Sequence, residues 1–432
     1  MLQNVHRAWW VAAAAFLALI GAAGFRSVPG VLIDPLHQEF GWSHGTIGSA
    51  VSINLLLFGL FSPFAAALMD RFGIRRVLVV ALVFLATGSS LTVFMTHPWQ
   101  LWLLWGVMVG IGAGSISMAF VATLVGRWFV EKRGLVTGIL TAAGATGQLV
   151  FLPLVAHLAT HYGWRVPALL VGATALAMVP LAWLAIRDHP HKLGLEAYGA
   201  TPANPTPPEP RGEGNAAAVA LGSLREAART RTFWLLAGGF AICGASTNGL
   251  VGTHFVPAAH DHGMPLTLAA SLLALIGLVD IVGTIGSGWL TDRVDPRYLL
   301  LGYYFLRGLS LMILPSLLAP NVQPSMWVFI IFYGLDWIAT VPPTVKLCQD
   351  RFGTSGAIVF GWVFASHQFG AAIAATGAGI IRDVQGSYNL AWYIAGGLCI
   401  IAAALSIMIR PNPVPEPELV PEEEPEPDPV SM

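Results

Sequence analysis

The sequence predicts an all-α membrane protein with twelve transmembrane helices, arranged as two six-helix halves. Of its 432 residues, 55% are hydrophobic and only 10% are charged, whereas soluble proteins have about 25% charged residues. Apolar runs of 20 or more residues recur along the chain, and each could cross a hydrocarbon core of roughly 30 Å. A membrane β-barrel is excluded, because its strands of about ten residues alternate apolar and polar side chains.

Most connections between the predicted spans are short, and one is long. Residues 187–231 contain the Pro- and Gly-rich stretch TPANPTPPEPRGEGN, which is typical of a flexible linker. This cytoplasmic linker separates an N-terminal half, 1–186, from a C-terminal half, 232–410. Residues 411–432 carry seven acids and no base, which predicts a disordered acidic tail. The twelve spans are predicted at 9–33, 46–69, 74–95, 99–125, 135–160, 165–186, 232–258, 266–290, 298–319, 325–347, 356–381 and 388–409.

Basic residues indicate the orientation in the membrane. If the N-terminus is cytoplasmic, the inner loops, termini and inner helix ends hold 18 of the 22 basic residues, and the outer loops hold only Arg165 and Arg382. This bias predicts that both termini face the cytoplasm of a bacterial-type inner (plasma) membrane. The first apolar run continues to Ile33, too far for the apolar region of a signal peptide.

The two halves repeat each other. The stretch MDRFGIRR follows the second predicted span and TDRVDPR follows the eighth, so that Asp70 and Asp292 are 222 residues apart. GRWFVEKRGLVTGILTAAGATGQ, 126–148, matches QDRFGTSGAIVFGWVFASHQFG, 349–370, at an offset of 223 to 224. The halves are therefore predicted to be structural copies, an architecture found in secondary transporters.

Among the ionisable residues within the predicted spans, five are expected to be buried in the membrane: Arg26, Asp280, Arg307, Asp336 and His367. Each costs at least a few kcal/mol in a bilayer, so each is a candidate functional group. At about 1.5 Å per residue, four of them lie near the middle of the membrane and Arg26 lies toward the outer side. One polar layer at this depth is where alternating-access carriers hold their substrate.

These residues allow more than one interpretation. Asp280 is either a structural partner of a cation or a proton carrier, since burial and a neighbouring cation act on a carboxyl group in opposite directions. Arg307 either pairs with Asp336 and locks spans 9 and 10 together, or contacts substrate. His367 either relays protons or is a neutral hydrogen-bonded group. The polar residues Asn54, Gln148, Asn248, Tyr333 and Trp337 are candidates to line a cavity, or ordinary interhelical packing residues.

The repeated Asp-Arg pairs at the inner helix ends predict a gate. Charges there can bridge neighbouring helices and hold the cytoplasmic side shut, which biases a two-state equilibrium. The gating candidates are Asp70, Arg71, Asp292 and Arg293.

The AALMDRFGIRR stretch resembles the Gly-x-x-x-Asp-Arg-x-Gly-x-Arg-Arg signature of the major facilitator superfamily, with Ala66 in place of the first glycine. Within that superfamily the chain is most similar to monocarboxylate transporters and their bacterial relatives, which include an oxalate–formate antiporter group. Three stretches carry this likeness: GFRSVPGVLIDPLHQEFGWS, GRWFVEKRGLVTGILTAAGATG and IGLVDIVGTIGSGWL.

The resemblance implies roles for residues in two spans. In the family, the aspartate matching Asp280 is implicated in proton-coupled transport, and an arginine four residues later binds the substrate carboxylate. Thr284 stands at that position here, so we expect the anion to be held elsewhere. Arg26 falls where the family has an essential lysine, and its guanidinium can bind a carboxylate with two hydrogen bonds. The alternative for Arg26 is a side chain that reaches out to the membrane interface.

The sequence thus predicts a secondary active transporter that moves a small organic anion, most plausibly a monocarboxylate, together with a proton by alternating access. Organic anion exchange and, less favoured, a transporter-derived receptor are the alternatives. No phosphate-binding loop and no metal-ligand spacing is present, which argues against an enzyme. The expected partners are the substrate, the proton and the lipid bilayer, with no nucleic acid and no cofactor beyond the proton gradient. We expect the protein to function as a monomer.

Overall fold

The computed structural model describes residues 6–26, 35–42, 44–209 and 214–410. The acidic tail and part of the first predicted span, 27–33, lie outside the described residues. Arg26 and Gln148 are described in their backbone only.

Helices form almost the whole described chain, because long apolar runs satisfy their backbone hydrogen bonds internally only as helices. The N-terminal half comprises α1 (Arg7–Ala22), η2 (Ala23–Arg26), α3 (His44–Phe72), α4 (Ile74–Leu91), η3 (Thr92–Phe94), α5 (Pro98–Leu101), η4 (Trp102–Val109), α6 (Gly110–Ser115), α7 (Met118–Trp128), α8 (Arg133–Tyr162) and α9 (Arg165–Ala185). The linker carries η5 (Pro190–Leu193) and α10 (Ala216–Ala227). The C-terminal half comprises α11 (Arg231–Gly244), η6 (Ala245–Val251), α12 (Gly252–Asp261), α13 (Leu266–Thr291), α14 (Pro296–Leu317), α15 (Pro324–Asp336), α16 (Val341–Phe352), η7 (Gly353–Ser355), α17 (Gly356–Gln385) and α18 (Asn389–Ile407).

The number of membrane crossings agrees with the prediction. Within the described residues, eleven helical segments are long and apolar enough to cross a membrane. The longest, Pro324–Gln385, has 62 residues, whereas one crossing needs about 20. It contains α15, α16 and, after a turn at Gly353–Ser355, the separate helix α17. Counted as two crossings, it gives the twelve-helix fold.

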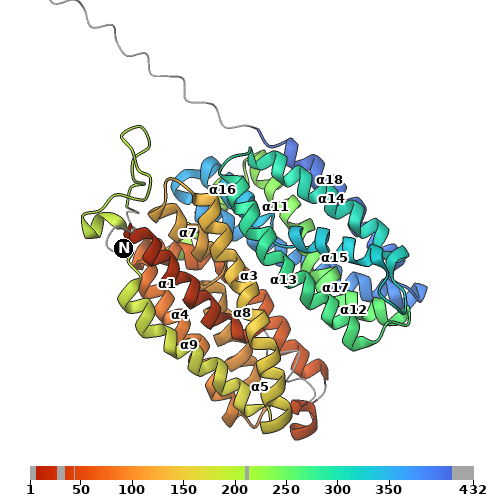
Figure 1. The fold of residues 1–432 in the computed structure, drawn as a ribbon. Coiled ribbons are helices and arrows are strands. Elements are labelled where there is room, and N and C mark those ends of the chain that lie inside the picture. Colours follow the sequence, from red (N-terminus) through yellow and green to blue (C-terminus); the bar gives the residue numbers. More distant parts are fainter. Residues whose placement is uncertain (1–5, 27–34, 43, 210–213, 411–432) are drawn as a thin grey trace, which may run out of the picture.

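The two halves are separate bundles that lie side by side. Figure 1 shows the N-terminal bundle in red to yellow and the C-terminal bundle in green to blue. Their main contacts are between α8 and α13 and between α3 and α17. Glycines allow the first of these crossings, because a Cβ on Gly138 would lie 2.6 Å from the Thr284 carbonyl oxygen. Small residues let membrane helices approach this closely.

Part of the segment between the halves is hydrogen-bonded to the N-terminal half. The Tyr198 N–H donates to the Trp128 carbonyl at 2.9 Å, and the Tyr198 carbonyl accepts from Val130 and Glu131 at 2.9 and 3.1 Å. The linker is therefore hydrogen-bonded to the connection between α7 and α8. Proline and glycine counts could not reveal these bonds, because backbone N–H and carbonyl groups make them.

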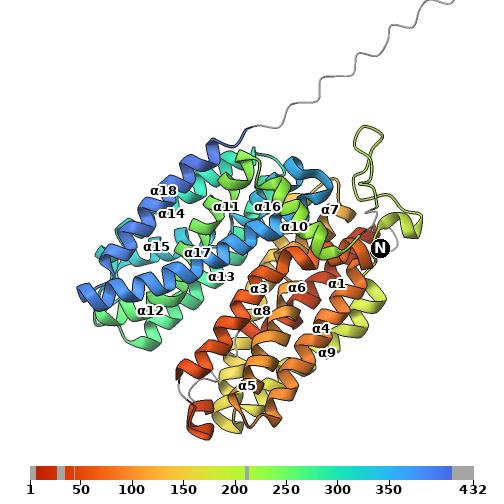
Figure 2. The same cartoon turned by 180° about the vertical axis from the view of Figure 1, so that it is seen from behind.

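Helix α10, which belongs to the same segment, joins the two halves. It packs against both α3 and α17, as Figure 2 shows. The Trp362 indole on α17 donates to the Ala220 carbonyl at 3.0 Å. The small buried side chains of Ala216 and Ala220 let α10 lie flat against its neighbours.

Two predicted spans, 99–125 and 325–347, are not continuous helices. The first is interrupted between α6 and α7, and the second between α15 and α16. At the repeat offset of 223, Ser117 in the first break corresponds to Thr340 in the second. In the second case Pro342 and Pro343 lack the N–H groups that would continue the helix backward. Such discontinuous helices surround the binding sites of many transporters.

Close packing at Gly283 gives a test of the fold. A Cβ there would overlap the Leu335 carbonyl group, so Gly283→Ala should lower the free energy of unfolding by about 1–3 kcal/mol. Gly286→Ala on the same helix is the matched control, because nothing lies within 4 Å of its added Cβ. Thermal unfolding in detergent measures both. Equal stability of the two variants would contradict the α13–α15 packing described above.

Candidate functional site

A buried ion pair lies in the middle of the C-terminal half. Arg307 on α14 donates through Nε to Asp336 Oδ2, at the end of α15, at 2.6 Å. The Arg307 side chain is 0% exposed and that of Asp336 is 8% exposed. The sequence left two roles open for Arg307, and the observed geometry matches the pairing that ties spans 9 and 10 together.

Every nitrogen of the Arg307 guanidinium has a partner. Nη1 donates to Cys243 Sγ at 3.0 Å, and Nη2 donates to the carbonyls of Asp336 and Trp337 at 2.6 and 3.2 Å. Cys243 Sγ in turn lies 3.2 Å from Thr340 Oγ1. In this conformation the guanidinium is therefore inaccessible to a substrate. The alternative role of Arg307, contact with the substrate, would require a rearrangement.

Asp280 is the second buried acid of this region, with 1% of its surface exposed. Its Oδ1 accepts from Thr284 Oγ1 at 2.8 Å, one helical turn along α13. The same oxygen accepts from the Ile338 N–H at 2.9 Å. Ile338 lies in the break between α15 and α16, so this carboxyl group connects two membrane helices.

Side chains form most of the hydrogen bonds to the backbone groups that the break leaves without a helical partner. Arg307 donates to the carbonyls of Asp336 and Trp337, and Asp280 accepts from the Ile338 N–H. Ser287 Oγ donates to the Ala339 carbonyl at 2.5 Å. Buried backbone groups without a partner would each be costly in the membrane. The charged residues therefore stabilise an interrupted helix, whatever else they do.

The N-terminal half shows that such a break does not require charges. Its counterpart, between α6 and α7, has a hydrogen bond of 2.6 Å between the hydroxyls of Ser62 and Ser117. At the repeat offset of 222, the residues corresponding to Asp280 and Arg307 are Phe58 and Leu85, and at the offset of 223 that relates the two breaks, Ala113 corresponds to Asp336. Support of the break thus does not by itself explain why the C-terminal half contains ionisable groups.

The network has one more acid than base. Asp280 and Asp336 both lie close enough to Arg307 to interact with it electrostatically. Asp336 Oδ1 is buried and has no hydrogen-bond partner among the described residues. With both acids ionised the network carries one net negative charge, and one bound proton makes it neutral. A site that alternates between these two states can carry a proton.

The other predicted cavity residues mostly make helix contacts. Asn54 Nδ2 donates to the Trp105 carbonyl at 2.9 Å, and Tyr333 Oη donates to the Ser246 carbonyl at 2.9 Å. Asn248 is exposed, on the π-helical segment η6. His367 is buried, with its ring 5.0 Å from that of Phe240. Trp337 packs against the Tyr333 ring at 5.7 Å.

The gating candidates make different contacts in the two halves. Asp292 caps the N-terminus of α8 across the interface, accepting from the Gly134 N–H at 2.7 Å and the Leu135 N–H at 2.9 Å. Asp70 instead pairs within its own half with Arg127, at 2.7 Å. The guanidinium groups of Arg71 and Arg293 lie 5.0 and 3.9 Å from the ring centres of Phe72 and Trp289.

Four contributors to the site were not identified from the sequence as functional residues. They are Cys243, Ser287 and Thr340, whose side chains are small and common in membrane helices, and the backbone N–H of Ile338. The only sequence signal for them is the Pro342–Pro343 pair, which could have marked the helix break.

Comparison with known proteins agrees with this arrangement. The model of the Major Facilitator Superfamily matches residues 15–375. The chain belongs to this superfamily. It is 24% identical to the uncharacterized MFS-type transporter YcxA of Bacillus subtilis (strain 168), over 96% of this chain and 97% of that one. It is 26% identical to monocarboxylate transporter 13 of Bos taurus, over 93% and 89%.

Solved structures of the superfamily share the fold. The human organic anion transporter MFSD10 aligns with a TM-score of 0.70 at 14% identity, over 93% of this chain and 100% of that one. The twelve-helix prediction and the superfamily resemblance are thereby confirmed. The protein is a transporter and not an enzyme.

The buried ion pair of this major facilitator protein should matter more for stability than an exposed one. Arg307→Met leaves a buried carboxylate and two carbonyls unpaired, so it should cost about 3–5 kcal/mol of unfolding free energy. Arg382→Met breaks a pair with Asp261 in which Arg382 is 42% exposed, and should cost at most about 1 kcal/mol. Unfolding in detergent compares the two, and similar losses would show that Arg307 does not hold α14 to α15.

Proposed function

We propose that this transporter moves a small organic anion, a monocarboxylate, together with a proton. The observation that carries the proposal is the buried Asp280–Arg307–Asp336 network, which has two acids for one base and no charged counterpart in the other half. The similarity to proteins named monocarboxylate transporters supports the substrate class.

Asp280 is the proposed proton carrier. When it is ionised, its Oδ1 accepts two hydrogen bonds, one of them from the Ile338 N–H. Protonation weakens that acceptor and so loosens the tie between α13 and the break in the next helix. Because Asp336 ends α15 two residues earlier, the change reaches the Arg307 pair through the same short stretch of backbone. Proton binding would in this way bias the equilibrium between two conformations.

Arg26 is the proposed binding group for the substrate carboxylate. It ends η2, directly after α1, and η2 packs against α8. Helix α8 also forms the close crossing with α13, the helix of Asp280. A carboxylate held by Arg26 in the N-terminal half and a proton held by Asp280 in the C-terminal half would both respond to relative movement of the halves.

The repeated Asp-Arg pairs are proposed to form the gate at the end of the molecule that carries the linker. At that end Asp292 caps α8 across the interface. If this end faces the cytoplasm, as the basic residues predict, substrate and proton would load from the outside. Inward opening would then break the hydrogen bonds of Asp292.

Replacement of Asp280 tests the proton assignment. Asp280→Asn keeps Oδ1, the oxygen that accepts both hydrogen bonds, but replaces the other oxygen with an NH2 donor and cannot release a proton, so accumulation driven by a pH gradient should fall to background in proteoliposomes. Counterflow of labelled substrate, in which no net proton moves, should persist. Substrates for the assay come from a thermal-shift screen of organic acids, since a bound ligand stabilises the folded protein.

The outcomes separate the competing functions. Undiminished pH-driven accumulation in Asp280→Asn would end the proton assignment. Counterflow in the unmodified protein without any response to the pH gradient would favour anion exchange. Ligand-induced stabilisation without counterflow would favour a receptor.

Replacement of Arg26 tests the carboxylate assignment. Arg26→Gln removes a charge-assisted bidentate contact, so the substrate KM should rise by at least about tenfold, equivalent to about 1.4 kcal/mol. Arg165→Gln, a change of an arginine whose side chain is 46% exposed and paired with Glu39, is the control and should leave KM unchanged. An unchanged KM in Arg26→Gln would remove Arg26 from the binding site.

A further inference from the structure

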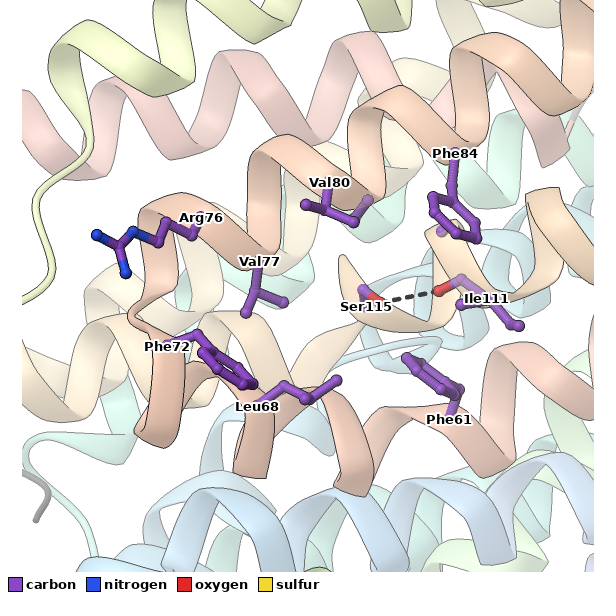
Figure 3. A pocket seen from close by; sticks show the side chains of 11 residues that line it. Phe61, Leu68, Phe72, Arg76, Val77, Val80, Phe84, Ile111 and Ser115 are labelled. Carbon is purple, nitrogen blue, oxygen red and sulfur yellow. Dashed lines mark hydrogen bonds between the residues drawn. The ribbon is translucent and has the colours of Figure 1, made fainter. Parts of the chain in front are cut away.

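An apolar groove lies on the N-terminal half, away from the charge network. Its volume is about 380 Å³, and it lies between α3, α4 and α6. Figure 3 shows Phe61, Phe84 and Ile111 at one end and Arg76 at the other, with Val77 and Val80 along its wall.

The groove offers almost nothing to a polar ligand. Apart from Arg76, its one polar lining side chain is Ser115, and that hydroxyl already donates to the Ile111 carbonyl at 2.9 Å. From Arg76 to Phe84 the wall runs along α4 for about 12 Å, at 1.5 Å per residue. An occupant must therefore be long and apolar over most of its length.

The groove lies between the helices that correspond, in the repeat, to α13, α14 and α15 of the C-terminal half. There, Arg307 and its partners tie α14 to α15. At the repeat offset of 222, Leu85 stands in the place of Arg307, and an apolar side chain cannot form such a tie.

The mouth of the groove is positively charged. Arg76 is exposed there, and Arg71 is exposed beside Phe72, a groove residue. The acids near this end have other partners, because Asp70 pairs with Arg127 and Asp188 accepts from the Arg75 N–H at 3.0 Å. Within the described part of the chain, neither Arg71 nor Arg76 forms an ion pair with an acid.

We propose that this groove binds one acyl chain of an anionic phospholipid, with the lipid phosphate at Arg76. The groove runs along membrane-spanning helices, where the surrounding solvent consists of acyl chains. Its charged end is at the predicted membrane surface, where basic side chains attract anionic head groups. The chemistry at the two ends thus matches one amphipathic molecule. The inference is independent of the transport substrate proposed above.

Native mass spectrometry of the full-length protein tests the proposal. The protein is extracted from equimolar phosphatidylglycerol and phosphatidylcholine that carry identical acyl chains, and the lipid retained per protein is counted. We expect preferential retention of one phosphatidylglycerol. Arg76→Gln should lower that retention about fivefold, the effect of one basic residue at a membrane surface, while Arg76→Lys should preserve it. Val80→Trp, which fills the groove, should abolish retention of either lipid.

Two matched variants separate this site from general lipid attraction. Arg293→Gln removes an equally exposed arginine after the corresponding helix of the other half, and Val282→Trp enlarges a 68% exposed residue of α13 outside the groove. Both should retain phosphatidylglycerol as the unmodified protein does. Equal retention of the two lipids, or no loss in Arg76→Gln, would overturn the head-group assignment. Unchanged retention in Val80→Trp would overturn the groove assignment.

Discussion

The contact between the Arg307 guanidinium and the broken helix α15–α16 is the constraint on which the C-terminal half depends. A charge in the membrane interior is costly unless all its donors are satisfied, and an interrupted helix there leaves carbonyls that need donors. Arg307 meets both needs by bonding to the Asp336 carboxylate and to two carbonyls of the break. The buried charge is stable because the helix break supplies acceptors, and the helix break is stable because Arg307 supplies donors. This mutual dependence explains why the ionisable groups lie beside the break.

The repeat makes the asymmetry of the halves informative. Both halves have a broken helix at equivalent positions, but the N-terminal break is held by the Ser62–Ser117 hydroxyl pair, with Leu85 in the place of Arg307. Duplication therefore preserved the backbone and let the side chains diverge. The C-terminal half has a network that can gain or lose a proton, whereas the N-terminal half has an apolar groove between the corresponding helices. The two halves can therefore serve different functions, because their side chains differ while their backbones match.

Much of this arrangement could be predicted from the sequence, and the rest depended on contacts that have no local signal. Length, hydropathy and the repeat predicted twelve helices, and the position of Arg307 and Asp336 in adjacent spans made their pairing one of two interpretations. The bond from the Ile338 N–H to Asp280 could not be foreseen, because it depends on where a helix breaks and how a neighbour rotates. The contacts of Tyr198 were missed for a similar reason, since its backbone N–H and carbonyl groups make them and backbone groups leave no signal in composition.

The interface between the halves shows how a transporter of this build can remain poised between two states. On one side Asp292 caps α8 across the interface, and on the other α10 packs on both α3 and α17, with a hydrogen bond from Trp362. A helix cap contributes only about 0.5–2 kcal/mol, and a single neutral hydrogen bond about 0.5–1.5 kcal/mol. The Asp292 cap and the Trp362 hydrogen bond are therefore weak compared with the buried pair at Arg307. A ligand with a modest preference for one state can thus shift the equilibrium between the two states. The polar ties within the C-terminal half are thus stronger than the polar ties between the halves, which lets the halves move as units.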